Sequence, residues 1–431
     1  MLGLAPRRDH VELAPRTGTT TTTTKVDDAR GRLRARALKT QDRRKAAWER
    51  CSQTRKPIPP PQPLTTALEQ TPPCRFLWAA ATNIGADCAQ SMRLRYLRFY
   101  GIAVLSAKAR TTSLRPILFL LNSSNQADHQ RASTKVTRMV SWLATELGVR
   151  VVEANDQSVV QRGLISHGVT GCRRGAYLRL DIPSLVYEHR LFDEPNVCNG
   201  LIMYTDCDVL FWRPLAYTDF RRAFPNRSAL AFGAEEKRSE GPFNTGVMFI
   251  NTSGFIAEQA FIQQWGERHH YSFTASDQGL LLAFYGISCH TSCQQAACKD
   301  ECGRQRARRS RHPTMMPESL AVEWNWKVYW GERRERNINV VHWHGMKPGA
   351  GPWLECLANP PYSQGSKCPA ILRGNSTRSA DAVPHQEAYL PQFDSAVKAD
   401  CGRMASVGLA MFKAYAAHVP PWDARIPSMT S

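Results

Sequence analysis

One short segment limits most strongly what this chain can fold into. Residues 201–204 are an apolar run, Leu-Ile-Met-Tyr, which is typical of a buried strand, and the run ends at Asp206-Cys207-Asp208. Two carboxylates one residue apart repel each other, and burial raises that cost. A divalent cation relieves the repulsion, because hard oxygen ligands suit Mg²⁺ or Mn²⁺, and substrate phosphates often complete its shell. The segment therefore predicts a metal–diphosphate site at the end of a strand. The alternative is an acidic turn.

Strand and helix patterns alternate on both sides of this segment. Strands are expected at 75–82, 116–122, 149–153, 201–204, 243–250 and 337–341. Helices are expected at 83–100, 135–147, 175–186 with a break at Pro183, and 276–285 with Ser276 as the N-cap, and a short helix is expected at 407–417. The alternation favours a parallel α/β sheet. Ligands of such sheets bind beyond the carboxyl ends of the strands, where Asp206 and Asp208 are placed.

Four further segments follow a recognisable order along the chain. They are GAYLRL at 175–180, FNTGVMFIN at 243–251, SDQG at 276–279 and HWHGMKP at 342–348. Together with the carboxylate pair they resemble the retaining nucleotide-sugar glycosyltransferases of family eight, the glycogenin and bacterial galactosyltransferase group, over roughly residues 75–353. The resemblance implies a GT-A type, Rossmann-like mixed α/β sheet flanked by helices. It also implies metal-dependent transfer of a hexose from a nucleotide sugar, with a UDP-sugar as the favoured donor.

The resemblance also assigns the metal ligands. Asp206 and Asp208 would chelate the cation, Asp206 bridging to the nucleotide ribose, and His342 would be the third ligand. Because imidazole suits Mn²⁺ better than Mg²⁺, Mn²⁺ is expected, with Mg²⁺ as the alternative. His344 would face the same side of an extended strand and is the less favoured ligand.

Other matching positions are implied to bind the donor. Arg179 would reach the diphosphate and the sugar, Asn244 and Asp277 would contact the sugar, and Gln278 would lie beneath the anomeric carbon. Gly345 and Lys347 would meet the diphosphate, and Thr82 and Asn83 the nucleotide. The chain departs from the family at Lys347, where the spacing after Gly345 is one residue shorter and Trp does not follow Pro348.

Two other functions remain open at this point. Gln278 is a poor nucleophile, so retention would proceed by same-face substitution rather than double displacement. An inverting transferase would need a carboxylate base, for which Asp277 is the candidate. A noncatalytic sugar- or nucleic-acid-binding protein is suggested by basic segments, although a binding protein needs no chelate and no aromatic-rich RNA segment is present. The acceptor, a glycan, protein or lipid, is not indicated by the sequence.

Charge and composition divide the chain into regions. Residues 1–60 carry 15 Lys/Arg against 6 Asp/Glu within a total net charge of +19. Residues 1–70 are therefore expected to be a disordered basic tail. Residues 71–358 would be the catalytic domain, with a Cys- and Arg-rich insertion at 289–313 expected to form a surface loop. Residues 359–431 would be a C-terminal extension of uncertain structure.

Thirteen cysteines bear on the compartment. Cys289, Cys293, Cys298 and Cys302 fit two disulfides, with a zinc site or free thiols as alternatives, and Cys207 is the candidate for a free thiol. Disulfides and the sequons at 122, 226, 251 and 375 favour the Golgi or secretory lumen. No apolar run reaches the ~18 residues of a membrane span, nor is a signal visible, so a cytoplasmic location is the alternative.

Overall fold

The computed structural model describes residues 73–122, 134–156, 158–225, 228–235, 242–310, 316–327, 338–343, 409 and 411–420. The predicted tail at 1–70, His344, Gly345, Lys347 and most of the extension at 359–431 lie outside the described residues. Among the described helices, none is long and apolar enough to cross a bilayer.

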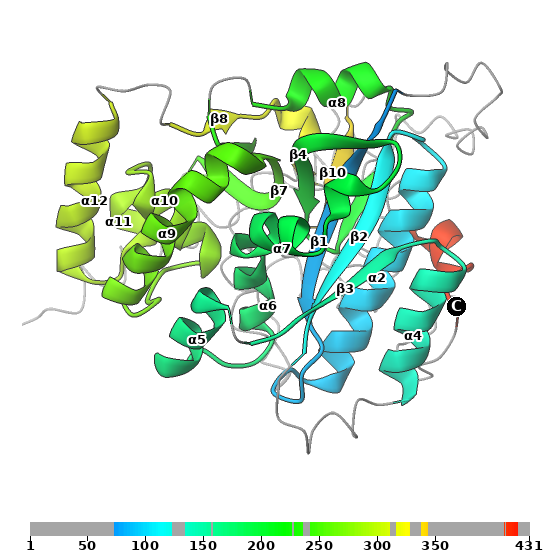
Figure 1. Ribbon diagram of the computed structural model, residues 1–431, viewed down its shortest axis with the longest axis horizontal. Coiled ribbons are helices and arrows are strands. Elements are labelled where there is room, and N and C mark those ends of the chain that lie inside the picture. Colours follow the sequence, from blue (N-terminus) through cyan, green and yellow to red (C-terminus); the bar gives the residue numbers. More distant parts are fainter. Residues whose placement is uncertain are drawn as a thin grey trace, which may run out of the picture.

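A seven-stranded sheet forms the centre of the molecule (Figure 1). Its spatial order is β3 (Arg150–Ala154), β2 (Leu114–Leu121), β1 (Arg75–Asn83), β4 (Val197–Thr205), β7 (Phe243–Asn251), β6 (Leu230–Ala234) and β8 (Glu318–Ser319). β1 pairs in parallel with β2 and β4, and β2 with β3. The mixed α/β sheet is thus confirmed. The fully parallel sheet suggested by the alternation is wrong for β7, which runs antiparallel to β4 and β6, because the connection between β6 and β7 is too short for a parallel crossover.

Successive side chains of β1 pack alternately into two hydrophobic cores, one on each face of the sheet. Phe76 and Trp78 join α2 (Gln90–Lys108) and α4 (Thr134–Thr145) on one face. Leu77 and Ala79 join the helices of the other face. Those helices are α5 (Val159–Ser166), α6 (Arg173–Tyr177), α7 (Ile182–Glu188), α9 (Thr252–Arg268) and α10 (Asp277–Phe284). The strand is apolar along almost its whole length because both faces are covered.

Two helical predictions shift in the structure. The helix expected at 83–100 begins only at Gln90, because β1 extends to Asn83 and residues 84–89 form a loop held by the Asn83 side chain and a disulfide from Cys88. The break expected at Pro183 is confirmed. α6 runs into a 3₁₀ turn at Leu178–Leu180, and Pro183 then lies in the first turn of α7, where a missing N–H costs nothing.

The Cys- and Arg-rich insertion is helical, so the predicted surface loop is wrong. α11 (Cys289–Ser292) and α12 (Ala296–Arg309) pack on α10. The chain folds back because Cys289 bonds Cys302 and Cys293 bonds Cys298, which confirms disulfides over zinc or free thiols for this cluster. The buried disulfides form the apolar side of α12. The helix was not predicted because its sequence is mostly charged and shows no periodic pattern of aliphatic residues.

Two more disulfides, Cys74–Cys198 and Cys88–Cys172, join the ends of distant segments. Cys207 is a buried thiol, as predicted, and its sulfur lies 3.8 Å from the Ala81 carbonyl oxygen. Four disulfides fit an oxidising compartment.

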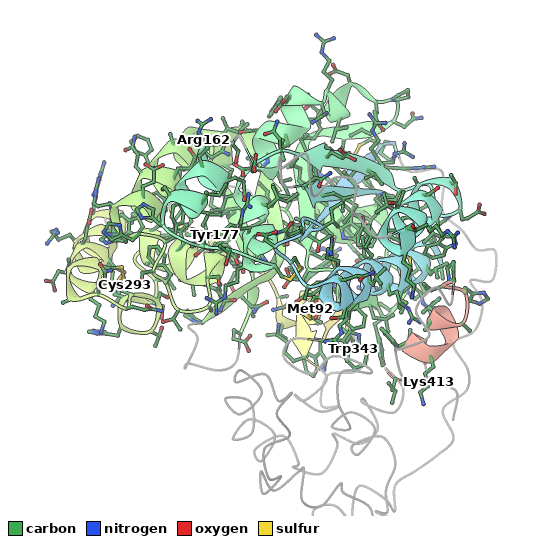
Figure 2. The ribbon with its side chains drawn as sticks, turned by 90° about the horizontal axis from the view of Figure 1, so that it is seen from below. Met92, Arg162, Tyr177, Cys293, Trp343 and Lys413 are labelled. Atoms are coloured by element: carbon green, nitrogen blue, oxygen red, sulfur yellow. A yellow bond between two sulfur atoms is a disulfide. The ribbon has the colours of Figure 1, made fainter. Side chains whose placement is uncertain are left out.

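A small second sheet, in the order β5 (Val209–Phe211), β10 (Val340–His342) and β9 (Trp326–Lys327), lies beside the end of β4. β10 is the strand expected at 337–341. A helical segment at 411–416, close to the predicted one, packs against this region. Its Phe412 ring contacts Phe99 of α2 and Trp343, the residue after β10. Figure 2 shows this helix, with Lys413, on the same side of the molecule as Trp343.

Candidate metal centre and donor site

Strand register brings the three predicted metal ligands together. Asp206 follows β4, and Asp208 immediately precedes β5. β10 runs antiparallel to β5 and pairs His342 with Val209, while the Trp343 amide donates to the Asp208 carbonyl over 3.0 Å. One ligand atom from each of Asp206, Asp208 and His342 can be chosen so that all lie within 4.8 Å of one another.

These residues fit a divalent cation. His342 Nε2 lies 3.5 Å from Asp206 Oδ2 and 3.7 Å from Asp208 Oδ1. With metal–ligand bonds of about 2.1 Å, ligand atoms in an octahedral shell are separated by ~3 Å when adjacent and ~4.2 Å when opposite, so both distances fall within the range. Asp208 and His342 are buried, whereas Asp206 is partly exposed, which leaves one side open to solvent. The His342 ring packs directly against the backbone of Gly246. Any larger residue would clash, because a Cβ at position 246 would lie 2.0 Å from His342 Cε1.

Arg179 links the carboxylates of two different elements. Its guanidinium contacts Asp206 Oδ1 at 3.0 Å and Asp277 Oδ2 at 2.9 Å, and it donates to the Thr245 carbonyl over 2.6 Å. It also lies 4.6 Å from the centroid of the Tyr204 ring. Arg179 is thus a buried side chain that does not face solvent. Burial lowers the pKa of Arg179, but the charges of Asp277 and the other neighbours raise it by more than burial lowers it. The net shift of the pKa is upward, and the side chain is charged.

Asp277 occupies the first turn of α10, where the helix dipole favours a carboxylate. Burial raises the pKa of Asp277 to about 6, against the opposing effects of the Arg179 charge and the Thr245 hydroxyl. Ser276 holds the N-cap position as predicted, but its side chain makes no capping hydrogen bond, so the predicted capping role is wrong. Its φ of +56° takes it out of the extended conformation in which a serine reaches the N3 amide.

Asn244 and Gln278 form a buried amide pair beside this cluster. Asn244 Nδ2 donates to Gln278 Oε1 over 3.0 Å, and the Gly246 amide donates to Asn244 Oδ1 over 2.9 Å. The structure therefore brings together seven of the residues that were predicted at the metal and donor sugar, namely Arg179, Asp206, Asp208, Asn244, Asp277, Gln278 and His342.

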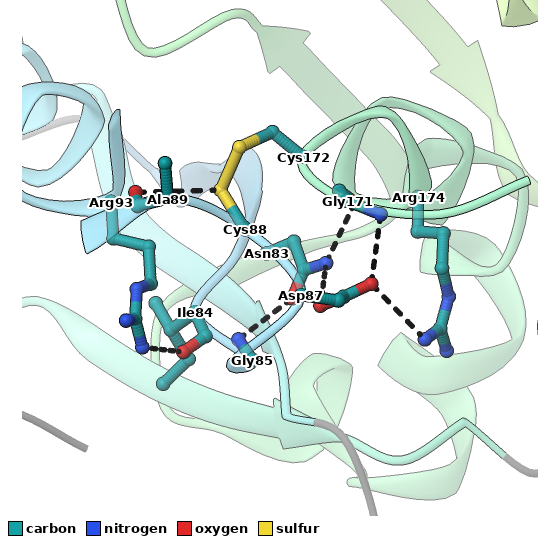
Figure 3. The surroundings of a disulfide bond; sticks show 10 residues. All are labelled: Asn83, Ile84, Gly85, Asp87, Cys88, Ala89, Arg93, Gly171, Cys172 and Arg174. Carbon is teal, nitrogen blue, oxygen red and sulfur yellow. Dashed lines mark hydrogen bonds and ion pairs between the residues drawn. A yellow bond between two sulfur atoms is a disulfide. The ribbon is translucent and has the colours of Figure 1, made fainter. Parts of the chain in front are cut away.

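The two residues predicted at the nucleotide lie at the end of β1. Thr82 is buried, and the side chain of Asn83 organises the following loop (Figure 3). Asn83 Nδ2 donates to Asp87 Oδ1 over 3.0 Å and to the Gly171 carbonyl over 2.9 Å, while Oδ1 accepts from the Gly85 amide. Since these bonds occupy the side chain, its visible role is to shape the loop, and a nucleotide contact stays a prediction.

Two residues that sequence reasoning missed contact the metal-facing histidine. His342 Nδ1 lies 2.9 Å from Asn325 Oδ1 and 2.8 Å from Lys327 Nζ. Both side chains are fully buried. The signal was the order Trp-Asn-Trp-Lys, in which residues 325 and 327 are two apart and share one side of extended chain.

Known proteins resemble this chain only distantly. No protein-family model matches it, and no curated protein sequence matches it. Similar solved structures include the apo form of the glycosyltransferase GlyE from Streptococcus pneumoniae TIGR4, at 14% identity and TM-score 0.35, over 76% of this chain and 65% of that one. Mouse xyloside xylosyltransferase 1 is 12% identical with TM-score 0.33, over 64% of this chain and 99% of that one. A glycosyltransferase involved in glycosylation of the major capsid of PBCV-1 is 12% identical with TM-score 0.29, over 53% and 93%. These likenesses are too distant to transfer an activity to the chain.

Proposed function

We propose that this protein is a metal-dependent glycosyltransferase that moves a hexose from a nucleotide sugar, with a UDP-sugar as donor, to a glycan, protein or lipid acceptor. The observation that supports the proposal is the convergence of Asp206, Asp208 and His342 at the carboxyl end of β4, open on the Asp206 side. Ligands of α/β sheets bind at this edge. A cation held there, with Mn²⁺ favoured by the imidazole, would supply positive charge to a departing diphosphate.

The neighbouring residues fit the remaining needs of the reaction. Arg179 holds a fixed positive charge against Asp206, where negative charge would develop on a leaving diphosphate. Asp277, Asn244 and Gln278 line the adjoining polar cluster and would orient the hydroxyls of the sugar. Asp277 Oδ2 is already bound to Arg179 and Thr245, so it is poorly placed as the free base that an inverting reaction requires. We therefore favour same-face substitution with retention.

Lys347 and Gly345 complete the proposal as diphosphate contacts, and Thr82 and Asn83 as nucleotide contacts. The four disulfides favour a Golgi or secretory location.

The proposal is tested by incubating the purified protein with a panel of UDP- and GDP-sugars, with and without Mn²⁺, and measuring release of the nucleoside diphosphate. Mn²⁺-dependent release from one donor is expected. Asp193→Asn, a change at an exposed carboxylate remote from the ligands, serves as the matched control and should release at the wild-type rate. Neither release nor metal-dependent nucleotide binding would favour a noncatalytic binding protein instead.

A further inference from the structure

The ring nitrogen of His342 that points away from the carboxylates has two neighbours of opposite hydrogen-bonding character. Asn325 Oδ1, at 2.9 Å, can only accept a hydrogen bond, and Lys327 Nζ, at 2.8 Å, can only donate one. An imidazole nitrogen offers a single in-plane position, which is either an N–H or a lone pair. His342 Nδ1 therefore satisfies one of these neighbours at a time.

The orientation of the Asn325 amide is fixed by its other contacts. Its Nδ2 donates to the Ala234 carbonyl over 3.0 Å and lies 3.5 Å from Asn244 Oδ1, which turns Oδ1 toward the histidine. The close packing needs Gly233, since a Cβ there would lie 2.7 Å from the Cβ of Asn325. The acceptor on Nδ1 is thus built into the core and coupled to the amide pair at the sugar side of the site.

We propose that Asn325 and Lys327 select the tautomer of His342, an inference that rests on the metal site of the proposed function. When Lys327 donates to Nδ1, the ring proton is on Nε2 and points at Asp206 and Asp208. When Nδ1–H donates to Asn325, Nε2 presents its lone pair to the cation. One proton leaves Nε2 to solvent on the open Asp206 side and one proton from solvent is taken up at Nδ1, so the neutral ring changes tautomer with no net change in protonation.

When Nδ1 carries the proton, Lys327 can no longer donate to it and turns its ammonium toward its other neighbours. Lys327 Nζ also lies 3.2 Å from Asn325 Oδ1 and 3.9 Å from Glu235 Oε2. Its charge is therefore still compensated when the histidine turns its N–H toward Asn325. Lys327 thus stabilises the tautomer of His342 in the metal-free state, and Asn325 stabilises the tautomer in the metal-bound state. Both act as positioning residues. Partners of the distal ring nitrogen commonly fix the tautomer of a metal-binding histidine.

Two variants should change Mn²⁺ affinity in opposite directions, measured by the electron paramagnetic resonance signal of free Mn²⁺ without any sugar donor. Asn325→Leu removes the acceptor and should weaken binding roughly 10-fold. Lys327→Met removes the donor that stabilises the binding-incompetent tautomer, so binding should tighten. Asn325→Asp keeps an acceptor and should bind better than Asn325→Leu. A purely structural role would weaken binding in both the leucine and the methionine variants, and that result would overturn the proposal.

The wild-type protein provides a test that does not depend on the folding of variants. In protein labelled with ¹⁵N-histidine, the His342 resonance, identified by its loss in His342→Asn, should report Nε2–H without metal and Nδ1–H with diamagnetic Mg²⁺. The same tautomer in both conditions would overturn the inference alone. Absence of any Mn²⁺ binding by the wild type would overturn the metal site itself, and with it both proposals.

Discussion

At the scale of single residues, the candidate metal centre consists of Asp206, Asp208 and His342, and a buried pair, Asn325 and Lys327, contacts the histidine. Asp206 and Asp208 could be predicted because two carboxylates after a strand are a local pattern, whereas His342 was predicted from the resemblance. Asn325 and Lys327 could not be predicted, because their importance depends on the pairing of β9 with β10, which the sequence does not show. Arg179 was predicted from a resemblance, and its contact with Asp277 depends on two elements about 100 residues apart meeting.

Asp208→Asn should separate the metal role from folding. The variant removes one of two apposed carboxylates, so the metal-free protein should unfold at a temperature no lower than the wild type. Mn²⁺ should raise the unfolding temperature of the wild type but not that of the variant, because only the wild type binds the ion tightly. Diphosphate release should fall at least ~100-fold. Full activity in the variant would contradict the assignment of this ligand.

Asp181 predicts a pH dependence of stability. Burial raises the pKa of Asp181 from 3.8 to about 7, against the opposing hydrogen bonds of Ser158 and Gln161. Below pH ~4 both folded and unfolded states are protonated, so there is no penalty. As pH rises from 4 to 7 the unfolded state ionises first, and the free energy of unfolding falls by up to roughly 4 kcal/mol.

Asp181→Asn should remove this penalty while keeping the acceptor for the Ser158 hydroxyl, 2.8 Å away. Urea unfolding should show that the free energy of unfolding of the variant exceeds that of the wild type, and that the difference is larger at pH 8 than at pH 5. Parallel behaviour of the two proteins across this range would show that Asp181 is not held protonated by the fold.

At the scale of elements, strands were easier to predict than the insertion. The strand at 243–250 was expected almost to the residue, since the apolar run at 247–250 leaves few alternatives for β7. α12 was missed because its buried side consists of cysteines and one arginine rather than aliphatic residues. Arg309 Nη1 lies 3.0 Å from Glu258 Oε1, and its guanidinium stacks 4.7 Å from the ring centroids of Phe284 and Tyr285.

Arg309→Met should therefore destabilise the protein. Removing the buried cation leaves Glu258 uncompensated, and because Glu258 is partly exposed the expected loss is about 2 kcal/mol, less than for a fully buried pair. Arg308→Met, a change at the exposed neighbour, should alter stability by less than ~0.5 kcal/mol. Chemical unfolding of both variants tests this. Mn²⁺ affinity should be unchanged, since α12 lies at one end of the molecule and β10 lies near its centre (Figure 1). Equal stability of the two variants would show that the pair does not anchor the helix.

At the scale of the whole molecule, the mixed sheet and its position relative to the site agree with what the sequence predicted, while the support of the site from the chain's C-terminal part was not expected. The antiparallel β7 and the separate three-stranded sheet depend on long-range pairing, for which local periodicity carries no information. The same holds for Phe412, which comes from a region assigned to an extension of uncertain structure but belongs to the core cluster shared with α2 and β10.

Phe412→Ala tests whether this helix stabilises the metal site as well as the core. Its ring meets Trp343 at a centroid distance of 6.1 Å, and Trp343, which follows the proposed ligand His342, donates its amide to the Asp208 carbonyl. Removing a buried aromatic side chain costs roughly 3 kcal/mol where the core cannot collapse around the cavity. Because the lost contact lies one residue from the ligand, Mn²⁺ binding should weaken together with stability. Lys413→Ala, on the next residue of the same helix, is the control and should change neither quantity. A variant with lowered unfolding temperature but wild-type Mn²⁺ affinity would limit the helix to a role in the core.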